Sequence, residues 1–442
     1  MVQRFDVGIV GLGYVGLTLA TVMAEVGFRV IGVERRPDVV ELTGAGKPHF
    51  SETGLENALG RVTRSGGLIA RQSFSEDVTC DVYIITVGTP LSESGVARLD
   101  MIEAATREVA ANMVDGALVI LRSTVKIGTT RNVVMPILQA TGKKFEIAMC
   151  PERTLEGRAL QELRELPQIV GADTQEGADR ASAVFRRLTS TVIQVERTET
   201  AEIIKLVDNT FRDVRFAFAN EVARVCDAFG VNAYEVVSSG KLGYERTNVP
   251  LPGLVGGPCL EKDPHILYQS ALEKGIELEI TRAGRVVNER QPVETVEFIL
   301  DEVRRRGFAD DVPIAVLGMA FKGVPATDDL RGSMSLKVLQ ALLERRPEAR
   351  VTLFDPVIPA DELAGRFPEH RTASSVADAV RGAAVVIIAN NHPELGVLMP
   401  ATLAELMLDQ GFIYDYWNHF STLADVERVG NYFAVGNAGG QL

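Results

Sequence analysis

Short apolar runs bounded by glycine or polar residues recur toward both ends of the chain. They span residues 5–10, 29–33, 81–87, 118–121 and 147–149 in the first part, and 314–317, 351–354 and 384–389 in the last. Such runs are typical of buried strands, and helix-like segments separate several of them. Strands that alternate with helices predict parallel sheets with helices on both faces. We therefore predict an α/β protein with two doubly wound Rossmann-like domains, one toward each end.

The middle of the chain shows the helical repeat instead. Over residues 199–229 apolar side chains recur every three or four positions, which is the spacing of one helix face. The positions are Ile203, Val207, Phe211, Val214, Phe218, Val222, Val225 and Phe229. Gly230 follows where a helix often ends, and a second helical stretch covers about residues 283–306. We predict a central all-helical region that joins the two domains.

The apolar stripe over residues 203–229 also predicts how the protein assembles. A helix of about thirty residues is roughly 45 Å long, which exceeds the width of a small domain. Part of the stripe should then stay exposed on a monomer, and large exposed apolar patches usually mark interfaces. We therefore expect a homodimer formed across this helix and its helical neighbours.

The motif Gly11-Leu-Gly-Tyr-Val-Gly16 follows the first apolar run and opens a helix-like segment. In a dinucleotide-binding fingerprint the first glycine makes the tight turn, the second lets the pyrophosphate approach, and the third lets helix and strand pack closely. Gly11, Gly13 and Gly16 stand at those positions. The helix N-terminus then offers its N–H groups to the phosphates. This setting predicts a bound dinucleotide.

Side chains at the ends of the following strands refine that prediction. Glu34 closes the second strand, where an acidic residue can hold a ribose hydroxyl, so NAD is the expected cofactor. Arg35 and Arg36 leave NADP as the alternative, because arginine there can bind a 2′-phosphate. Thr89 and Thr124 follow two further strands, where they could contact the cofactor or only cap the next turn or helix.

Residues 252–263 carry the clearest candidate for covalent chemistry. Three glycines and two prolines precede Cys259, and Lys262 and Asp263 follow it. Glycine lets the backbone approach a ligand, and a nearby cation lowers the pKa of a thiol. We interpret Cys259 as a nucleophile on a glycine-rich loop. A small buried cysteine beside a turn is the alternative.

Three other groups of residues could act in a site, and their role depends on what surrounds them. Glu152, Arg153 and Glu156 follow a short strand, where they could do acid/base work or form a solvated loop. Lys205 and Asn209 are one helical turn apart, so they share a face beside the apolar stripe. They could bind a developing oxyanion or could face solvent. Phe321 and Lys322 follow a strand of the second Rossmann-like domain and could grip a base or sugar and a phosphate.

The composition of the chain mainly excludes certain partners and kinds of site. The net charge of -13 argues against nucleic acid or an anionic membrane as partner. The four cysteines and five histidines are scattered, so we expect neither a disulfide framework nor a metal site. This cysteine usage fits the reducing cytoplasm, which is the expected location. Residues 7–24 are uncharged and long enough to span a bilayer, but four glycines interrupt them. We read them as a buried strand, loop and helix.

Taken together, these motifs resemble the family of nucleotide-sugar 6-dehydrogenases, which includes UDP-glucose dehydrogenase, over nearly the whole chain. The matching motifs are Gly11-Leu-Gly-Tyr-Val-Gly16, Ser123-Thr124-Val125, Pro151-Glu152-Arg153, Lys205 with Asn209, Gly256-Gly257-Pro258-Cys259, Lys262-Asp263, Ala320-Phe321-Lys322 and Asp328-Asp329-Leu330-Arg331. The resemblance implies an NAD-binding domain at 1–196, a helical dimerisation region with the cysteine loop at 197–308, and a UDP-sugar domain at 309–442. It also implies two successive oxidations of the sugar's C6 alcohol, with Cys259 carrying first a thiohemiacetal and then a thioester.

The resemblance assigns roles to residues. Implied catalytic residues are Cys259, Lys205, Asn209, Asp263 and Glu152. Implied substrate contacts are Glu152, Arg153, Lys205, Asn209, Arg246, Gly256, Phe321 and Lys322. Cofactor contacts, from the fingerprint and the resemblance together, are Gly11, Gly13, Tyr14, Val15, Gly16, Glu34, Thr89, Thr124, Glu156, Lys262 and Arg331.

Different residues favour different substrates within this family. The segments at 151–157 and 211–214 resemble the branch that oxidises UDP-N-acetylhexosamines, such as UDP-ManNAc or UDP-GlcNAc. Pro258 stands where several members of that branch have histidine, and Lys262-Asp263 resembles the UDP-glucose enzymes, so UDP-glucose is the alternative substrate. A two-electron 6-phosphogluconate-type dehydrogenase would not need Cys259. A non-catalytic NAD-sensing scaffold would need neither Cys259 nor Lys205.

Overall fold

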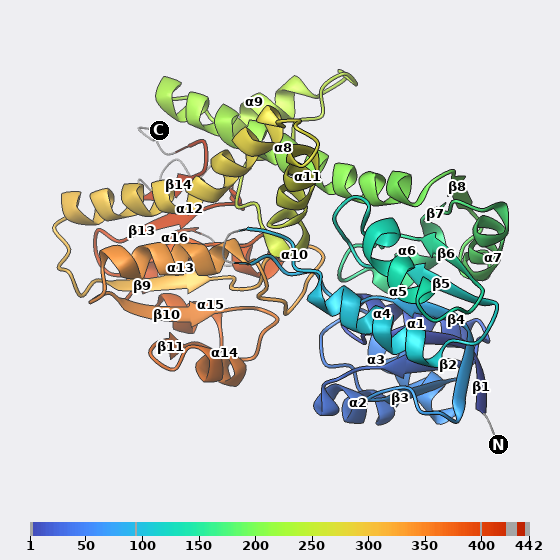
Figure 1. Ribbon diagram of the computed structural model, residues 1–442. Helices are drawn as coiled ribbons and strands as arrows, with labels where there is room; N and C mark the ends of the chain where they lie inside the picture. The colour runs from blue at the N-terminus through green and yellow to red at the C-terminus, as the bar shows by residue number, and fades with distance from the viewer. Residues whose placement is uncertain (1–2, 93–94, 398–399, 421–430, 438–442) are drawn as a thin grey trace. The chain divides into compact units, whose positions relative to one another are not determined.

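The computed structural model describes residues 3–92, 95–397, 400–420 and 431–437 (Figure 1). It divides into two compact units, one of Met1–Asp208 with His265–Glu277, the other of Asn209–Pro264 with Leu278–Leu442. Each unit contains one sheet, and the predicted class of two Rossmann-like domains with a central helical region is confirmed. Within the described residues no helix is both long and apolar enough to cross a membrane.

The first unit is built on an eight-stranded sheet in the order β3-β2-β1-β4-β5-β6-β7-β8. Its strands are β1 (Gln3–Val10), β2 (Val30–Val33), β3 (Leu68–Arg71), β4 (Val78–Ile85), β5 (Ala117–Leu121), β6 (Phe145–Met149), β7 (Gln168–Gly171) and β8 (Val192–Val195). Its helices are α1 (Tyr14–Glu25), α2 (Pro37–Gly44), α3 (Leu55–Arg64), α4 (Asp100–Asn112), η1 (Thr130–Val134), α5 (Met135–Gln139), α6 (Ala159–Glu165) and α7 (Gln175–Phe185). Neighbouring strands run parallel except β6 and β7. Strand β5 and the second halves of β1 and β4 are wholly apolar because helices bury both faces of the sheet there.

The second unit contains a six-stranded parallel sheet in the order β11-β10-β9-β12-β13-β14. Its strands are β9 (Pro313–Leu317), β10 (Arg350–Phe354), β11 (Arg371–Thr372), β12 (Val385–Ile388), β13 (Phe412–Asp415) and β14 (Tyr432–Ala434). Its helices are α9 (Ala233–Gly240), α10 (Gly257–Leu260), α12 (Glu279–Arg305), α13 (Met334–Arg345), α14 (Ala360–Arg366), α15 (Val376–Val380), η2 (Pro393–Gly396) and α16 (Pro400–Leu406). Two further helices, α8 (Thr198–Phe229) and α11 (Asp263–Leu272), cross the boundary between the units.

The predicted strands all form, but several observed ones were not predicted. Strands β3 and β8 lie at the edges of the first sheet, and β8 is partly exposed along its whole length. An edge strand need not be a continuous apolar run, so its sequence signal is weak. Strands β7, β11, β13 and β14 are two to four residues long, too short to give a clear pattern.

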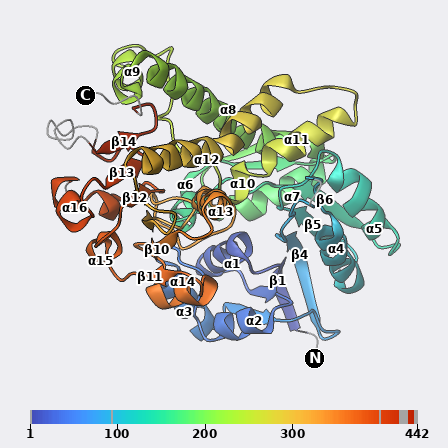
Figure 2. The ribbon, with the colours of Figure 1, turned by 90° about the vertical axis from the view of Figure 1, so that its left-hand side faces the viewer.

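Helix α8 is amphipathic, but its apolar side is mostly exposed and its polar side is partly buried. Six of the eight residues of the predicted stripe are exposed, from 39% for Ile203 to 79% for Phe229. In the second unit the opposite face carries buried polar and small side chains, Asp213, Ala217 and Asn220 among them, and packs along α12. Figure 2 shows α8 and α12 side by side, as does Figure 1. Most of the apolar stripe of α8 is therefore exposed, while Val222 packs against the core of the second unit.

Candidate active site

The glycine fingerprint forms the expected turn between β1 and α1. Gly11 has a φ of +95° and donates its N–H to Val33 O over 2.7 Å. A Cβ added to Gly16 would lie 1.8 Å from Gly11 O, so only glycine fits there. A Cβ on Gly13 would meet nothing within 4 Å, and no side chain caps the helix at that point. The loop therefore leaves space and N–H donors where a pyrophosphate would bind.

Three predicted cofactor residues lie at the ends of strands in this sheet. Glu34 contacts the fingerprint turn, and Thr89 contacts Thr124. Glu34 accepts the N–H of Leu12 over 3.0 Å through Oε2 and that of Arg36 over 3.1 Å through Oε1. These bonds hold its carboxylate beside the turn. Thr89 is buried and its hydroxyl donates to the carbonyl oxygen of Thr124. Both threonines lie beyond the ends of neighbouring parallel strands, where ligands of such sheets bind.

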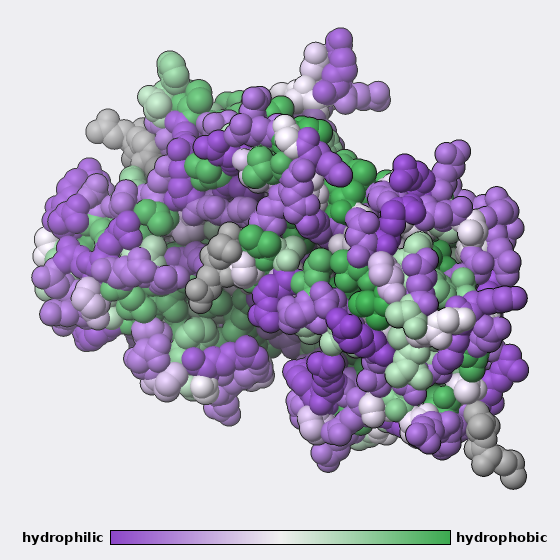
Figure 3. All heavy atoms as spheres, in the orientation of Figure 1, coloured by the Kyte–Doolittle hydropathy of each residue, from purple (hydrophilic) through white to green (hydrophobic). Residues whose placement is uncertain are grey.

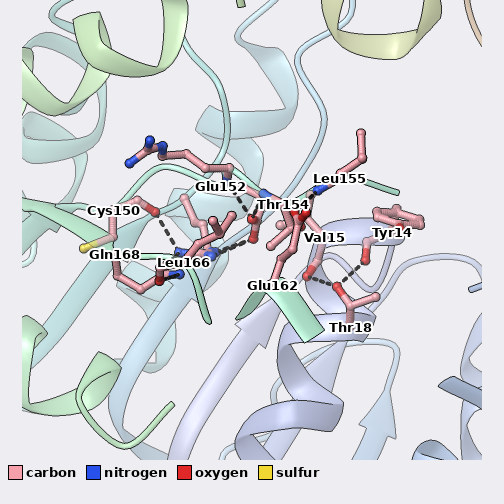
Figure 4. A network of polar contacts seen from close by, with 12 residues as sticks. Tyr14, Val15, Thr18, Cys150, Glu152, Thr154, Leu155, Glu162, Leu166 and Gln168 are labelled. Carbon is pink, nitrogen blue, oxygen red and sulfur yellow. Dashed lines mark hydrogen bonds and ion pairs between the residues drawn. The ribbon is translucent and has the colours of Figure 1, made fainter. Parts of the chain in front are cut away.

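Glu152 is buried and holds four hydrogen-bond donors (Figure 4). Its Oε1 accepts the N–H groups of Arg153 and Thr154 over 2.6 and 2.7 Å. Its Oε2 accepts from Nη2 and Nε of Arg122 over 2.6 and 3.0 Å. Burial by itself raises the pKa of Glu152, but the charges of Arg122 and Lys205 and the donated hydrogen bonds outweigh it and hold that pKa below its usual range. The geometry favours an ionised anchor for the loop over a group that exchanges protons.

Arg122 was not singled out as a site residue from the sequence, although a signal was present. It follows the apolar run of β5 directly and its side chain is fully buried. Besides Glu152 it donates to Cys150 O and Gln168 Oε1 over 3.1 Å each, and its guanidinium lies 5.1 Å from the centre of the Phe185 ring. A cation placed at the end of a buried strand must find a carboxylate partner. That requirement could have pointed to Glu152.

A second buried acid, Glu52, fixes the other end of the same loop. Its Oε2 accepts the N–H of Gly157 over 2.7 Å and its Oε1 that of Ala159 over 3.0 Å. The hydroxyl of Tyr14 also donates to Glu52. Burial, followed by the hydrogen bond to Glu52 and the negative charge of Glu156, raises the pKa of Tyr14. Glu52 thus joins the fingerprint to the loop that carries Glu152, and it stands in a polar segment without a motif that could have identified it.

Lys205 and Arg153 complete the group of predicted residues in the first unit. Lys205 is buried in α8 and its charge helps to lower the pKa of Glu152. Arg153 is a third exposed and forms an ion pair with Asp208, 3.2 Å from Nε to Oδ2. In the first unit the charges of Arg122 and Lys205 therefore act on the Glu152 carboxylate, while the Arg153 guanidinium pairs with Asp208.

In the second unit the cysteine loop lies tightly on the Rossmann-like domain. Gly257, with a φ of +90°, donates its N–H to Gly332 O over 2.7 Å. A Cβ on Gly257 would lie 2.4 Å from the ring of Phe321, and one on Gly256 would lie 2.5 Å from Gly332 O. Both glycines are therefore required for close approach. Cys259 follows in the short helix α10 and is exposed.

Asp263 connects the cysteine loop to α8. Its side chain is fully buried, and its Oδ2 accepts from Asn209 Nδ2 over 2.6 Å. Its Oδ1 accepts from Lys262 Nζ over 2.7 Å. The carboxylate thereby fixes the amide of Asn209 and the ammonium group of Lys262, both of which were predicted to act in the site.

The other predicted cations of this unit each contact a residue close to them in the sequence. Lys322 Nζ lies 5.2 Å from the centre of the Phe321 ring. Arg331 forms a two-pronged ion pair with Asp329, with its shortest contact at 2.6 Å. Arg246 is exposed and stacks over the ring of Tyr244 at 4.8 Å.

Exposure separates Cys259 from the other three cysteines, which are buried. Burial raises the pKa of Cys80 and of Cys150 to about 12, and it also raises the pKa of Cys226. These three thiols remain protonated and shielded at neutral pH, and a thiolate is the reactive form. Cys259 is thus the cysteine that a soluble substrate can reach.

Three family models match consecutive parts of the chain. They are described as the NAD binding domain, the central domain and the UDP binding domain of the UDP-glucose/GDP-mannose dehydrogenase family, and they match residues 5–189, 199–290 and 315–422. A UDP-N-acetyl-D-mannosamine dehydrogenase from Pyrococcus horikoshii is 34% identical over 394 residues, which cover 88% of this chain and 90% of that protein. The chain belongs to the UDP-glucose/GDP-mannose dehydrogenase family.

Solved structures of this family agree with the fold. The structure of UDP-D-ManNAc dehydrogenase from P. horikoshii has a TM-score of 0.85 at 30% identity and covers 99% of this chain and 100% of its own. A UDP-glucose dehydrogenase from Pyrobaculum islandicum has the same TM-score at 31% identity and covers 95% of both chains. The protein is thus an NAD-dependent nucleotide-sugar dehydrogenase. The turn at Gly11, the open space at Gly13 and the carboxylate of Glu34 fit the dinucleotide.

The space at the fingerprint can be tested by adding one methyl group. We expect Gly16→Ala to weaken NAD binding at least about tenfold, because its Cβ would overlap Gly11 O and displace the turn. Calorimetric titration with NAD measures the change. The control is Gly44→Ala in α2, where a Cβ meets nothing within 4 Å. Wild-type affinity in Gly16→Ala would contradict the assignment of this turn to the cofactor.

Proposed function

We propose that this enzyme oxidises the C6 alcohol of a UDP-sugar to the carboxylate, with two NAD reduced per turnover and Cys259 as the covalent nucleophile. The observation that carries the proposal is an exposed cysteine beside the buried pair of Asp263 and Asn209, with the partly exposed Lys262 bonded to Asp263. A dehydrogenase that stopped at the aldehyde would have no use for a thiol there. Oxidation from alcohol to acid in one enzyme requires a covalent hold on the aldehyde. The thiol chemistry also fits the reducing, cytoplasmic location predicted from the cysteines.

The residues have distinct tasks in this scheme. NAD, when bound, accepts a hydride in each of the two oxidations. The Cys259 thiolate adds to C6 of the aldehyde and forms a C–S bond, and the same bond breaks when water attacks the thioester and releases the acid. Lys205 and Asn209 supply donors to the oxygen at C6 while it carries negative charge. Asp263 orients two donors through its two oxygens, and Glu152 keeps its loop in place.

We further propose a UDP-N-acetylhexosamine as the substrate. Several relatives are UDP-N-acetyl-D-mannosamine dehydrogenases, among them proteins from P. horikoshii, Methanococcus maripaludis and Campylobacter jejuni at 30% to 34% identity. The partly exposed Arg153, steadied by Asp208, offers a charged donor to an acetamido carbonyl. A UDP-glucose 6-dehydrogenase from Haloferax volcanii is 32% identical over 89% of this chain, so UDP-glucose is the second candidate.

A substrate panel tests both parts of this proposal. We expect kcat/KM to be about tenfold higher for UDP-ManNAc or UDP-GlcNAc than for UDP-glucose, the factor of one hydrogen bond to a charged group. We also expect two NADH for each acid formed. Absorbance of NADH and chromatography of the products give both quantities. Preference for UDP-glucose would reverse the substrate choice, and one NADH per product would overturn the four-electron reaction.

The covalent step has its own test. We expect Cys259→Ser to lose acid formation by at least about a thousandfold, because a hydroxyl is far less ionised than a thiol at neutral pH. NAD binding and thermal unfolding should match the wild type, because the side chain is exposed. The measurement is acid formed per enzyme under NAD saturation. Acid formation near the wild-type rate would exclude the thioester route.

We also propose that the enzyme is a homodimer formed across α8. Its outward face is apolar, and it borders a groove of about 660 Å³ that includes Phe218, Val225 and Phe229. Figure 3 shows apolar residues gathered over the C-terminal end of α8. Apolar patches of this kind mark interfaces. A twofold axis would place the same face of a second copy against it.

One substitution should separate the copies. We expect Phe218→Asp to shift the protein to a monomer, because a charge buried without a partner costs several kcal/mol. Light scattering at micromolar concentration measures the mass. The control is Met101→Asp in α4, which also places a charge at an exposed apolar position. A monomeric wild type with full activity would show that this face is not an interface.

A further inference from the structure

The cysteine loop is held at both ends by a buried chain of hydrogen bonds that crosses two helices. We propose that four side chains, Asn220 and Asp213 of α8 with Arg285 and Asn288 of α12, form a clamp that sets the position of Cys259, with Arg285 as its principal positioning residue. The proposal rests on the proposed function of Cys259. The four clamp residues are each no more than 3% exposed and belong to the second unit.

One end of the clamp holds the start of the cysteine loop. The N–H of Gly253 donates to Asn220 Oδ1 over 2.9 Å. Asn220 Nδ2 donates to Asn288 Oδ1 over 3.1 Å. Asn288 Nδ2 in turn donates to Asp213, to Oδ1 over 3.0 Å and to the main-chain oxygen over 3.1 Å. Each bond fixes the next side chain, so the backbone at Gly253 is tied to both helices.

The other end holds the residue that follows the nucleophile. Arg285 Nη1 donates to Asp213 Oδ1 over 2.7 Å and to the main-chain oxygen of Leu260 over 3.1 Å. Its Nε and Nη2 bind Glu289 over 3.3 and 3.1 Å. The planar guanidinium can satisfy these three partners at once because its donors diverge at fixed angles. Arg285 therefore sets where the chain runs immediately after Cys259.

The short helix that carries Cys259 needs such support. Helix α10 has only four residues, too few to be stable alone. Its first residue is tied to Gly332 and packs against Phe321, and its last carbonyl is tied to Arg285. A nucleophile displaced by about 1 Å can lose about a hundredfold in rate. Both fixed ends are thus needed to keep the thiol in line with its target.

Stability alone gives no reason for this choice of residues. Apolar side chains of similar volume usually pack two helices at least as well as a buried ion pair does. Oδ2 of Asp213 is also buried and has no hydrogen-bond partner among the described residues, which is a cost that apolar packing would avoid. The hydrogen-bonded side chains instead fix the positions of the groups they join, because hydrogen bonds constrain both angles and distances. That property serves the loop and is not required by the helix pair.

The test is the partition of the aldehyde intermediate. Arg285→Lys keeps the charge, but one ammonium group cannot reach Asp213, Leu260 O and Glu289 together. We expect the first oxidation to continue, while capture by the displaced thiol slows about a hundredfold. Aldehyde would then leave the enzyme, where a hydrazine reagent traps it, and NADH per acid would rise well above two. Asp213→Asn, which preserves shape, should shift the partition in the same direction by a smaller factor.

Controls separate a positioning role from loss of structure. A partly unfolded enzyme would make less of everything, with NADH per acid still two, so the ratio reports position and not folding. Arg304→Lys, at an exposed site of α12 that pairs with Asp301, should behave as the wild type. An unchanged ratio in Arg285→Lys and Asp213→Asn, with a wild type that makes two NADH per acid, would overturn the clamp alone. One NADH per product in the wild type would overturn the proposed function and the clamp with it.

Discussion

The ion pair between Asp213 and Arg285 is the interaction on which the second unit depends most directly. It lies between α8 and α12 with both charges removed from solvent, and it is bonded at one side to Asn288 and at the other to Leu260 O. Burial raises the pKa of Asp213, and Arg285 opposes that rise. Removal of either partner alone would leave a buried charge, so the two residues constrain each other and, through Leu260, the cysteine loop.

The same helix face explains why α8 exposes its apolar side. A helix that turns Asp213 and Asn220 inward has no room for its large apolar residues there, so Phe211, Phe218 and Val225 point outward. The inward face uses small or polar residues because the clamp and the close approach to α12 require them. The outward face then needs another cover, for which a second copy of the chain is the proposed source. The contacts that position the loop and the proposed subunit contact thus lie on opposite faces of one helix.

Local patterns carried most of the sequence prediction. The fingerprint at Gly11, the period of α8 and the cysteine between glycines and charges are each contained within a short segment, and the family resemblance joined them. Glu52, Arg122 and the pair of Asp213 and Arg285 act through partners tens of residues away. Only the fold brings such partners together, and charged residues of this kind are on average at the surface. Short and edge strands such as β8 were missed for a related reason, since their pairing and not their own pattern defines them.

The contacts of Glu152 bear on which of its two predicted roles the geometry favours. The motif left acid/base work and a solvated loop as alternatives; in the structure Glu152 is buried, four donors fill its two oxygens, and its pKa is lowered. A carboxyl group whose folded pKa lies below its unfolded value of about 4.3 contributes stability above that value, which is lost as the pH falls through the lower folded pKa. Near neutral pH Glu152 is therefore ionised throughout, and its charge balances Arg122 and Lys205. In the proposed chemistry the reacting group is the exposed thiol of Cys259, and the Glu152 carboxylate serves to hold its own loop.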